Sequence, residues 1–149
     1  MKSYEIERKY LIKQVPENLA SYPFREIEQG YLCTEPVVRI RRQDEDYYLT
    51  YKSKGLMIRE EYNLPLTKDA YFHLREKIDG RLISKRRYLI PLDPYTIELD
   101  VFRSPKDDLI LAEVEFPSEE EALHFTPPAW FGKDVTNSSL YHNSHLSTL

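Results

Sequence analysis

The sequence contains a single cysteine, Cys33, among its 149 residues. One thiol can form neither an intrachain disulfide nor a metal site built from several thiolates, so the cytoplasm is the expected compartment. Apolar runs long enough to span a bilayer are also missing, and the N-terminus does not have the pattern of a signal peptide. The sequence therefore indicates no membrane partner.

A surplus of basic residues is likewise absent. The 21 Lys and Arg residues are outnumbered by 25 Asp and Glu residues, which gives a formal net charge of −4. This balance argues against a general nucleic-acid or membrane-surface binder. The length and the even spread of charge instead predict a single domain over residues 1–149 with a sizeable core.

Histidine pairs that would suggest zinc are missing too. The four histidines show no HExxH motif or comparable spacing. His142 and His145 are three residues apart, and we expect both on the surface of a short C-terminal helix. A zinc site is therefore not indicated.

The sequence does contain many segments in which side chains alternate in polarity. Alternation with period 2, bounded by turn residues, predicts β-strands. We expect strands at residues 4–12, 25–33, 37–43, 47–53, 57–66, 82–90, 95–102 and 109–116. We expect short helices at residues 15–22, 67–78, 118–125 and within 137–149. Because the connections are mostly short turns, the fold class is α+β with a mainly antiparallel sheet, either an open platform or a closed barrel.

The two faces of these predicted strands differ in chemistry. One face is aliphatic or aromatic, and the other carries almost only full charges. The charged face consists of Glu5, Glu7, Lys9, Arg39, Arg41, Lys52, Arg59, Glu61, Lys85, Arg87, Glu98, Asp100, Glu113 and Glu115. A face that is simply solvated would accept Ser, Thr and Gln as readily as charged residues.

Closure of the sheet into a barrel would turn these charges toward one another. Like charges about 4 Å apart repel by roughly 4 kcal/mol at an effective dielectric constant near 20. A polyphosphate with bound Mg²⁺ or Mn²⁺ would reduce the repulsion among the basic residues and among the acidic residues, because arginine binds phosphate bidentately and carboxylates bind hard cations. Cross-strand salt bridges are the competing interpretation, and for any single residue they are the better one. The set as a whole favours a binding site.

The segment Glu5-Ile6-Glu7-Arg8-Lys9 resembles the ExExK signature of the CYTH superfamily, the triphosphate tunnel metalloenzymes. The resemblance continues in order through residues 29–32, 38–41, 50–52, 59–62, 85–88, 97–102, 112–116 and 130–132. It is strongest to the short bacterial branch. It implies a closed eight-stranded β-barrel, or tunnel, with a few peripheral helices and a C-terminal helix. One departure is Asn63, where the family often has a second glutamate after the one that matches Glu61.

This resemblance implies metal-dependent hydrolysis of a triphosphate and divides the charged residues into two sets. The expected ligands of Mg²⁺ or Mn²⁺ are Glu5, Glu7, Glu61, Glu113 and Glu115. The expected phosphate ligands are Lys9, Arg39, Arg41, Lys52, Arg59, Lys85 and Arg87. The family suggests a tyrosine as proton acceptor, for which Tyr31 is the candidate, and Lys9 is a second candidate for assisting water activation.

Inorganic triphosphate is the favoured substrate, and other readings remain open. A class IV adenylate cyclase would convert ATP to cyclic AMP in the same tunnel, and thiamine or nucleoside triphosphates would meet the same phosphate ligands. A non-catalytic polyphosphate-binding module would bind without turnover, and a plain structural barrel would not bind at all. A small-molecule triphosphate is the expected partner; a homodimer is compatible with the sequence, which does not set the oligomeric state.

Overall fold

The computed structural model describes residues 2–149 and consists mainly of one antiparallel sheet of nine strands. The strands are β1 (Lys2–Ile12), β2 (Phe24–Thr34), β3 (Val37–Gln43), β4 (Asp46–Lys52), β5 (Ile58–Pro65), β6 (Asp79–Leu92), β7 (Tyr95–Ser104), β8 (Ile110–Glu115) and β9 (Phe131–Asp134). The helices are α1 (Lys68–Arg75), α2 (Glu119–Leu123) and α3 (Asn143–Leu146), with 3₁₀ turns η1 (Leu19–Ser21) and η2 (Ser139–Tyr141). No helix in this described part of the chain is long and apolar enough to cross a membrane.

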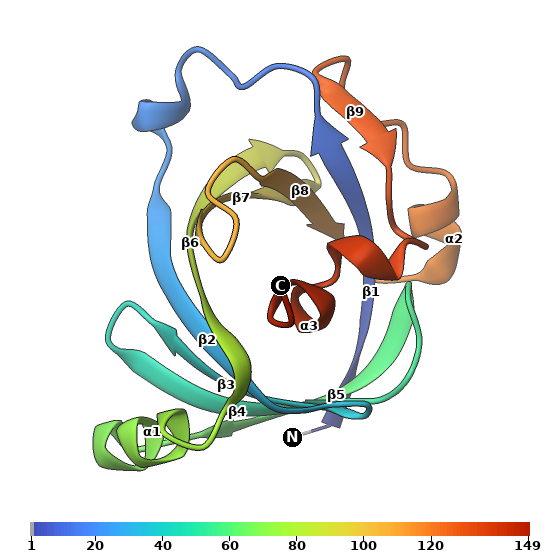
Figure 1. Cartoon of the computed structure of the whole chain (residues 1–149). Helices are drawn as coiled ribbons and strands as arrows, with labels where there is room; N and C mark the ends of the chain where they lie inside the picture. The colour runs from blue at the N-terminus through green and yellow to red at the C-terminus, as the bar shows by residue number, and fades with distance from the viewer. Residues whose placement is uncertain (1) are drawn as a thin grey trace.

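The sheet closes into a barrel because β1 pairs along its length with two other strands. Its first part, Lys2–Ile6, is antiparallel to β5, and the following Glu7–Leu11 is antiparallel to β8. The remaining order is β5-β4-β3-β2-β6-β7-β8, so eight strands form the ring. Figure 1 looks into this ring and shows α3 and the C-terminus in its middle. The closed antiparallel barrel expected from the sequence is thus confirmed.

The apolar side chains form two clusters, one outside the barrel wall and one inside it. The outer cluster contains Tyr10, Leu99 and Val114 of the wall, packed with Ala122 of α2 and Phe131 of β9. The inner cluster is composed of Tyr31, Val37, Ile83, Phe102, Leu109, Leu111, Val135 and Leu146. Leu146 belongs to α3, so the C-terminal helix packs on apolar side chains of the wall within the barrel.

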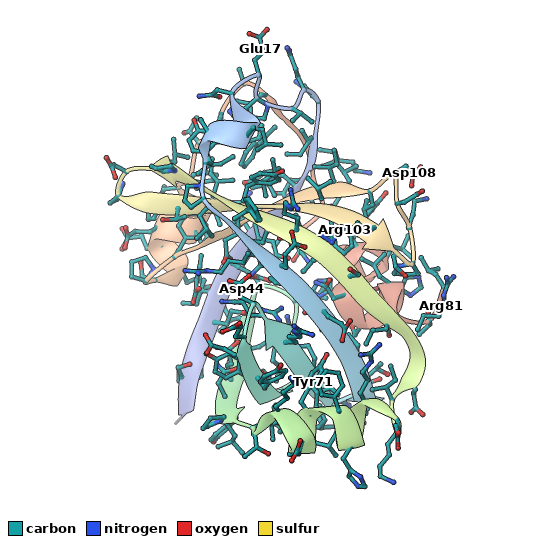
Figure 2. The ribbon with its side chains drawn as sticks, turned by 90° about the vertical axis from the view of Figure 1, so that its left-hand side faces the viewer. Glu17, Asp44, Tyr71, Arg81, Arg103 and Asp108 are labelled. Atoms are coloured by element: carbon teal, nitrogen blue, oxygen red, sulfur yellow. The ribbon has the colours of Figure 1, made fainter. Side chains whose placement is uncertain are left out.

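Helix α1 covers the outside of the barrel near β3 and β4. Thr67 caps its N-terminus as expected, accepting a hydrogen bond from the Ala70 backbone. Tyr71 is fully buried beneath the helix; its hydroxyl donates to the Glu28 carboxylate at 2.9 Å, and its ring lies 5.1 Å from that of Tyr47. Figure 2 shows Tyr71 between the helix and the strands.

The expected helix at residues 15–22 is wrong. Only a single 3₁₀ turn, η1, forms there. Tyr22 precedes Pro23 and is extended (φ −89°, ψ 149°), as the ring of a following proline requires. With Pro16 at the other end, the segment has no room for a regular helix.

Two further boundaries differ from expectation, and one strand was not expected. Helix α1 ends at Arg75, before the predicted end at Ile78, because the chain has already entered β6 at Asp79. The helix after Ser118 ends at Leu123, although its cap forms as predicted. Strand β9 has only four residues, too few for alternation to be visible, and it exists because it pairs with Tyr10 and Ile12 of β1.

We predict that Gly80→Ala lowers the free energy of unfolding by at least about 1–2 kcal/mol, the cost of a left-handed conformation for a residue with a side chain. Gly80 has φ +68°, and an added Cβ would lie 2.3 Å from the Ser147 carbonyl oxygen of the C-terminal segment. Urea unfolding measures the difference, with Asp79→Ala, at an exposed neighbouring position, as the control. Equal stability of Gly80→Ala and wild type would contradict the tight packing of the C-terminal segment.

Candidate active site

The interior of the barrel contains a cavity of about 230 Å³, called the tunnel below. Its wall includes Glu5, Glu7, Lys9, Tyr31, Arg39, Arg41, Lys52, Arg59, Glu61, Arg87, Glu98, Glu113 and Glu115. These residues come from eight different strands, and each points inward because alternate residues of a strand face the same side. Of the expected site residues, Lys85 alone does not line the cavity; it is fully buried and paired with Asp100 at 2.7 Å.

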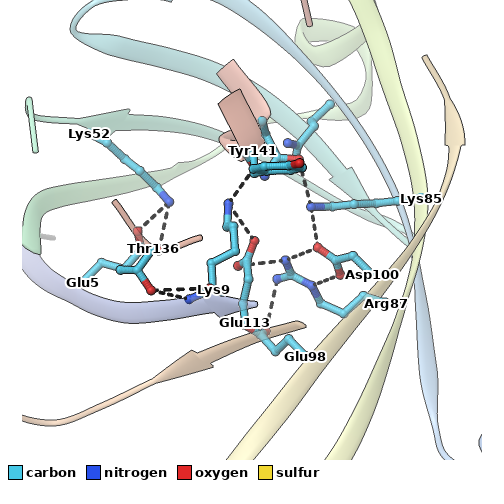
Figure 3. A network of polar contacts seen from close by, with 12 residues as sticks. Glu5, Lys9, Lys52, Lys85, Arg87, Glu98, Asp100, Glu113, Thr136 and Tyr141 are labelled. Atoms are coloured by element: carbon cyan, nitrogen blue, oxygen red, sulfur yellow. Dashed lines mark hydrogen bonds and ion pairs between the residues drawn. The ribbon is translucent and has the colours of Figure 1, made fainter. Parts of the chain in front are cut away.

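Part of the tunnel charge is already neutralised by ion pairs. Arg87 binds Asp100 through two parallel bonds of 2.7 and 2.9 Å, and its guanidinium also reaches Glu98 and Glu113. Figure 3 shows this arginine at the centre of the network. The Lys9 ammonium lies 3.3 Å from Glu113. For these residues, the salt-bridge interpretation of the charged face is correct.

Glu5 is also paired, with Lys52 at 2.9 Å and Arg59 at 3.4 Å. Burial by itself would raise the pKa of Glu5, but the two cations outweigh burial and lower the pKa to about 2. Lys52 additionally lies 3.5 Å from Glu61. Asn63, at the position where the family pattern departs, donates a hydrogen bond of 3.0 Å to Glu61 and so orients that carboxylate.

Two arginines of the tunnel have no acidic partner. Arg39 is 5% exposed, and its buried Nε has no hydrogen-bond acceptor among the described residues. Arg41 donates from Nε to the amide oxygen of Gln29 at 2.9 Å, and no carboxylate of residues 2–149 lies within ion-pair distance of it. Burial, followed by repulsion from Arg39 and Arg87, lowers the pKa of Arg41 to about 9. Arg39 and Arg41 are thus tunnel cations without an ion pair among residues 2–149.

Two tunnel carboxylates, Glu7 and Glu115, have no basic ion-pair partner among the described residues. Glu7 faces Glu115 directly across the β1–β8 pair, and neither is ion-paired within the described chain. Burial, then repulsion from Glu113 and Glu5, raises the pKa of Glu7 well above its usual range. Burial and the neighbouring Glu5, Glu98 and Glu61 raise the pKa of Glu115 to about 7. Glu115 is on the exposed rim, so this side of the tunnel is open to a cation from solvent.

The buried lysines Lys9 and Lys85 have pKa values shifted in opposite directions. Burial opposes the charge on Lys9, but Glu113 and Glu7 outweigh it and raise the pKa of Lys9. Lys85 is less well compensated: burial, aided by Arg87 and Arg41, lowers the pKa of Lys85 to about 8 despite its contact with Asp100. Tyr31 is 2% exposed, and its hydroxyl accepts a weak hydrogen bond of 3.5 Å from Gln29.

The C-terminal segment contributes tunnel residues that the sequence analysis missed. His142, Asn143 and Ser144 line the cavity. The Lys9 ammonium donates to the Tyr141 carbonyl at 3.2 Å, and the Lys85 ammonium donates to the side-chain oxygen of Asn143 at 3.2 Å. The expected surface position of His142 is wrong, since this residue is 6% exposed. The apolar Leu146 was the one available signal that the segment packs inside.

Comparison with known proteins agrees with this geometry, although no family model matches the chain. The chain is 40% identical over 148 residues to an inorganic triphosphatase of Nitrosomonas europaea, covering 96% of each chain. It is 33% identical over 148 residues to an inorganic triphosphatase of Acetivibrio thermocellus, covering 95% of this chain and 92% of the relative. A crystal structure of an inorganic triphosphatase superposes with a TM-score of 0.72 at 36% identity, covering 97% of this chain and 95% of that one.

The fold, the ExExK motif inside the tunnel and the full-length similarity to these relatives lead to one conclusion. The chain belongs to the CYTH superfamily of triphosphate tunnel metalloenzymes, in the family of the inorganic triphosphatases.

Proposed function

We propose that this protein hydrolyses inorganic triphosphate to pyrophosphate and orthophosphate with the help of a divalent cation. One observation carries the proposal: among residues 2–149, the same tunnel holds two arginines without an acidic ion-pair partner, the buried Arg39 and the half-buried Arg41, and two carboxylates without a basic one, Glu7 and Glu115. A polyanion and a hard cation together satisfy both deficiencies. We also propose that residues 1–149 form one domain in the cytoplasm, on the basis of length and the single cysteine.

The carboxylate side of the tunnel fits Mg²⁺ or Mn²⁺. Among residues 2–149, no three acidic or histidine side chains converge into a complete metal site. Mg²⁺ usually takes one or two carboxylates and completes its shell with phosphate oxygens and water, so two carboxylates would be a sufficient contribution from the protein. Within the ligand set Glu5, Glu7, Glu61, Glu113 and Glu115, the unpaired Glu7 and Glu115 are the primary candidates. A cation bound there supplies charge neutralisation at the phosphates.

The arginine side would hold the phosphate oxygens. Arg39 and Arg41 are free to form bidentate contacts, while Lys9, Lys52, Arg59 and Arg87 would exchange part of their pairing with carboxylates for phosphate. Fixed cations around a transferring phosphoryl group stabilise the charge that develops in the transition state. Arg59 and Arg87 are already positioned by carboxylate partners, so binding of phosphate would replace one oxygen ligand by another with little movement of the side chain.

The attacking water must lose a proton, and three buried groups are close to the tunnel. Lys9 is disfavoured, because its raised pKa keeps it protonated. Lys85 has a pKa lowered to about 8, but it does not line the cavity and is paired with Asp100 at 2.7 Å, so the geometry does not bring it to the attacking water. Tyr31 lines the cavity, and the positive charge of Arg41 acts on its hydroxyl. We therefore favour Tyr31, the first candidate expected from the sequence, as the proton acceptor.

Inorganic triphosphate suits the tunnel better than a nucleotide. Apart from Tyr31 and Val37, the residues that line the cavity are charged or polar. A nucleobase or a thiamine ring would find little apolar surface there, and such surface is what small-molecule pockets usually provide. The adenylate cyclase and nucleoside triphosphatase alternatives are for this reason not favoured.

We predict that Glu7→Gln lowers kcat/KM for triphosphate by about 100-fold or more, the loss of one important charge contact. The same change should leave the metal-free protein as stable as wild type or more stable, because a buried carboxylate without a partner costs free energy. Phosphate release and thermal unfolding measure the two effects, with exposed Glu17→Gln as the control. Full activity in Glu7→Gln would remove Glu7 from the site.

Substrate choice gives a second test. Triphosphate should be hydrolysed fastest, ATP at least about 100-fold less efficiently, and pyrophosphate least of all, because a shorter anion reaches fewer of the cations. The measurement is phosphate release from each compound with Mg²⁺ and with Mn²⁺, alongside a chelator control. Binding of triphosphate without turnover under every condition would favour the non-catalytic binding module instead.

The proton acceptor can be tested by two substitutions. Tyr31→Phe removes the hydroxyl and keeps the ring, and it should lower kcat for triphosphate by about 100-fold or more. Lys85→Arg keeps the positive charge beside Asp100 and should retain most of the activity. Phosphate release measures both, and the reverse pair of results would move the role from Tyr31 to Lys85.

A further inference from the structure

The side chain of His142 lies at the boundary between two cavities. It lines the tunnel, and it also lines a second cavity of about 360 Å³ between the β2–β3 turn, the β4–β5 loop and the C-terminal segment. His142 joins η2 to α3, inside the ring of strands. The imidazole therefore stands at the end of the tunnel that the C-terminal segment closes.

The residues directly before and after His142 both accept hydrogen bonds from buried lysines. Tyr141, before it, accepts from the Lys9 ammonium, and Asn143, after it, accepts from the Lys85 ammonium. The backbone of His142 is fixed as well, since its carbonyl accepts from the backbone amides of His145 and Leu146 at 3.0 Å each. An anion held by Lys9 would thus lie beside a ring whose position is already set.

One nitrogen of this ring has no partner. Nε2 is buried and makes no hydrogen bond with any described residue, whereas the ring does bond to the backbone of Thr136. Buried polar atoms without a partner are rare in folded proteins, and each one calls for an explanation. The groups that face the ring are cations, Lys9 and Arg59, together with the carboxylate of Glu113. In the neutral ring this nitrogen is an acceptor, so it can bind an anion only after taking up a proton, and an anion that offsets Lys9 and Arg59 would favour that uptake.

We propose that Nε2 of His142 is a further substrate contact, which binds an oxygen of the terminal phosphate of triphosphate at the closed end of the tunnel. This inference rests on the proposed function. The ring is neutral in the free protein, because burial, then Lys9 and Arg59, lower the pKa of His142 to about 4. A bound polyanion would offset these two cations, so the ring would take up a proton and donate from Nε2.

The competing reading is that His142 only fills the end of the tunnel. Substitution of His142 by Asn or by Gln distinguishes these two interpretations. The side-chain amide of Asn can replace Nδ1 of histidine, whereas that of Gln can replace Nε2. If Nε2 binds phosphate, His142→Asn should raise KM for triphosphate by about tenfold, the loss of one charge-assisted hydrogen bond, with a smaller change in kcat. His142→Gln should restore much of the wild-type KM. His145→Asn, in the adjoining helix α3 and outside the tunnel lining, is the matched control.

Proton uptake gives a readout that a merely structural role would not move. Titration calorimetry of triphosphate into wild-type protein with EDTA, in two buffers of different ionisation enthalpy near pH 7, should show protons taken up, and His142→Asn should lose about one of them. Thermal unfolding of each variant establishes that it is folded. Wild-type KM and proton uptake in His142→Asn, with triphosphate hydrolysis intact, would overturn this inference and leave the proposed function standing. Absence of binding and hydrolysis in the wild-type protein would overturn both.

Discussion

The pairing of β1 with both β5 and β8 is the constraint on which the site depends. If the sheet were open, the charged face of the strands would lie in water, where ion pairs contribute little and isolated charges cost little. Closure removes the same side chains from water and turns them toward one another. The electrostatic character of the tunnel is therefore a consequence of backbone hydrogen bonds at one seam.

Burial of so many charges is tolerable because the fold neutralises some of them internally. Arg87 and Asp100 form a bidentate pair that is screened from water, and Lys85 shares the same carboxylate. The remaining charges are separated by sign, with Arg39 and Arg41 on one side and Glu7 and Glu115 on the other. Such separation costs stability in the free protein, and that cost is offset by the apolar clusters on both sides of the wall.

The sequence was sufficient to predict the wall of the tunnel but not its closed end. Strand parity is a local property, so the inward direction of Glu5, Glu7 and Lys9 could be predicted once closure was assumed. The burial of His142 could not, because it depends on Leu146 packing against strands more than thirty residues away in the chain. The same limit applies to β9, which is a strand only because β1 offers it an edge, and to the protonation of Lys85, which depends on three neighbouring elements.

The C-terminal segment links the fold to substrate choice. A barrel open at both ends would accept a polyphosphate of any length, whereas α3, fixed by Leu146 and by the Ser147 carbonyl that accepts from Arg81, closes one end. The cavity that remains is small and lined almost wholly by polar side chains, and such a cavity would discriminate by charge density and length more than by the shape of an organic group. The proposed preference for a short inorganic anion would then depend as much on the last ten residues as on the charged strands.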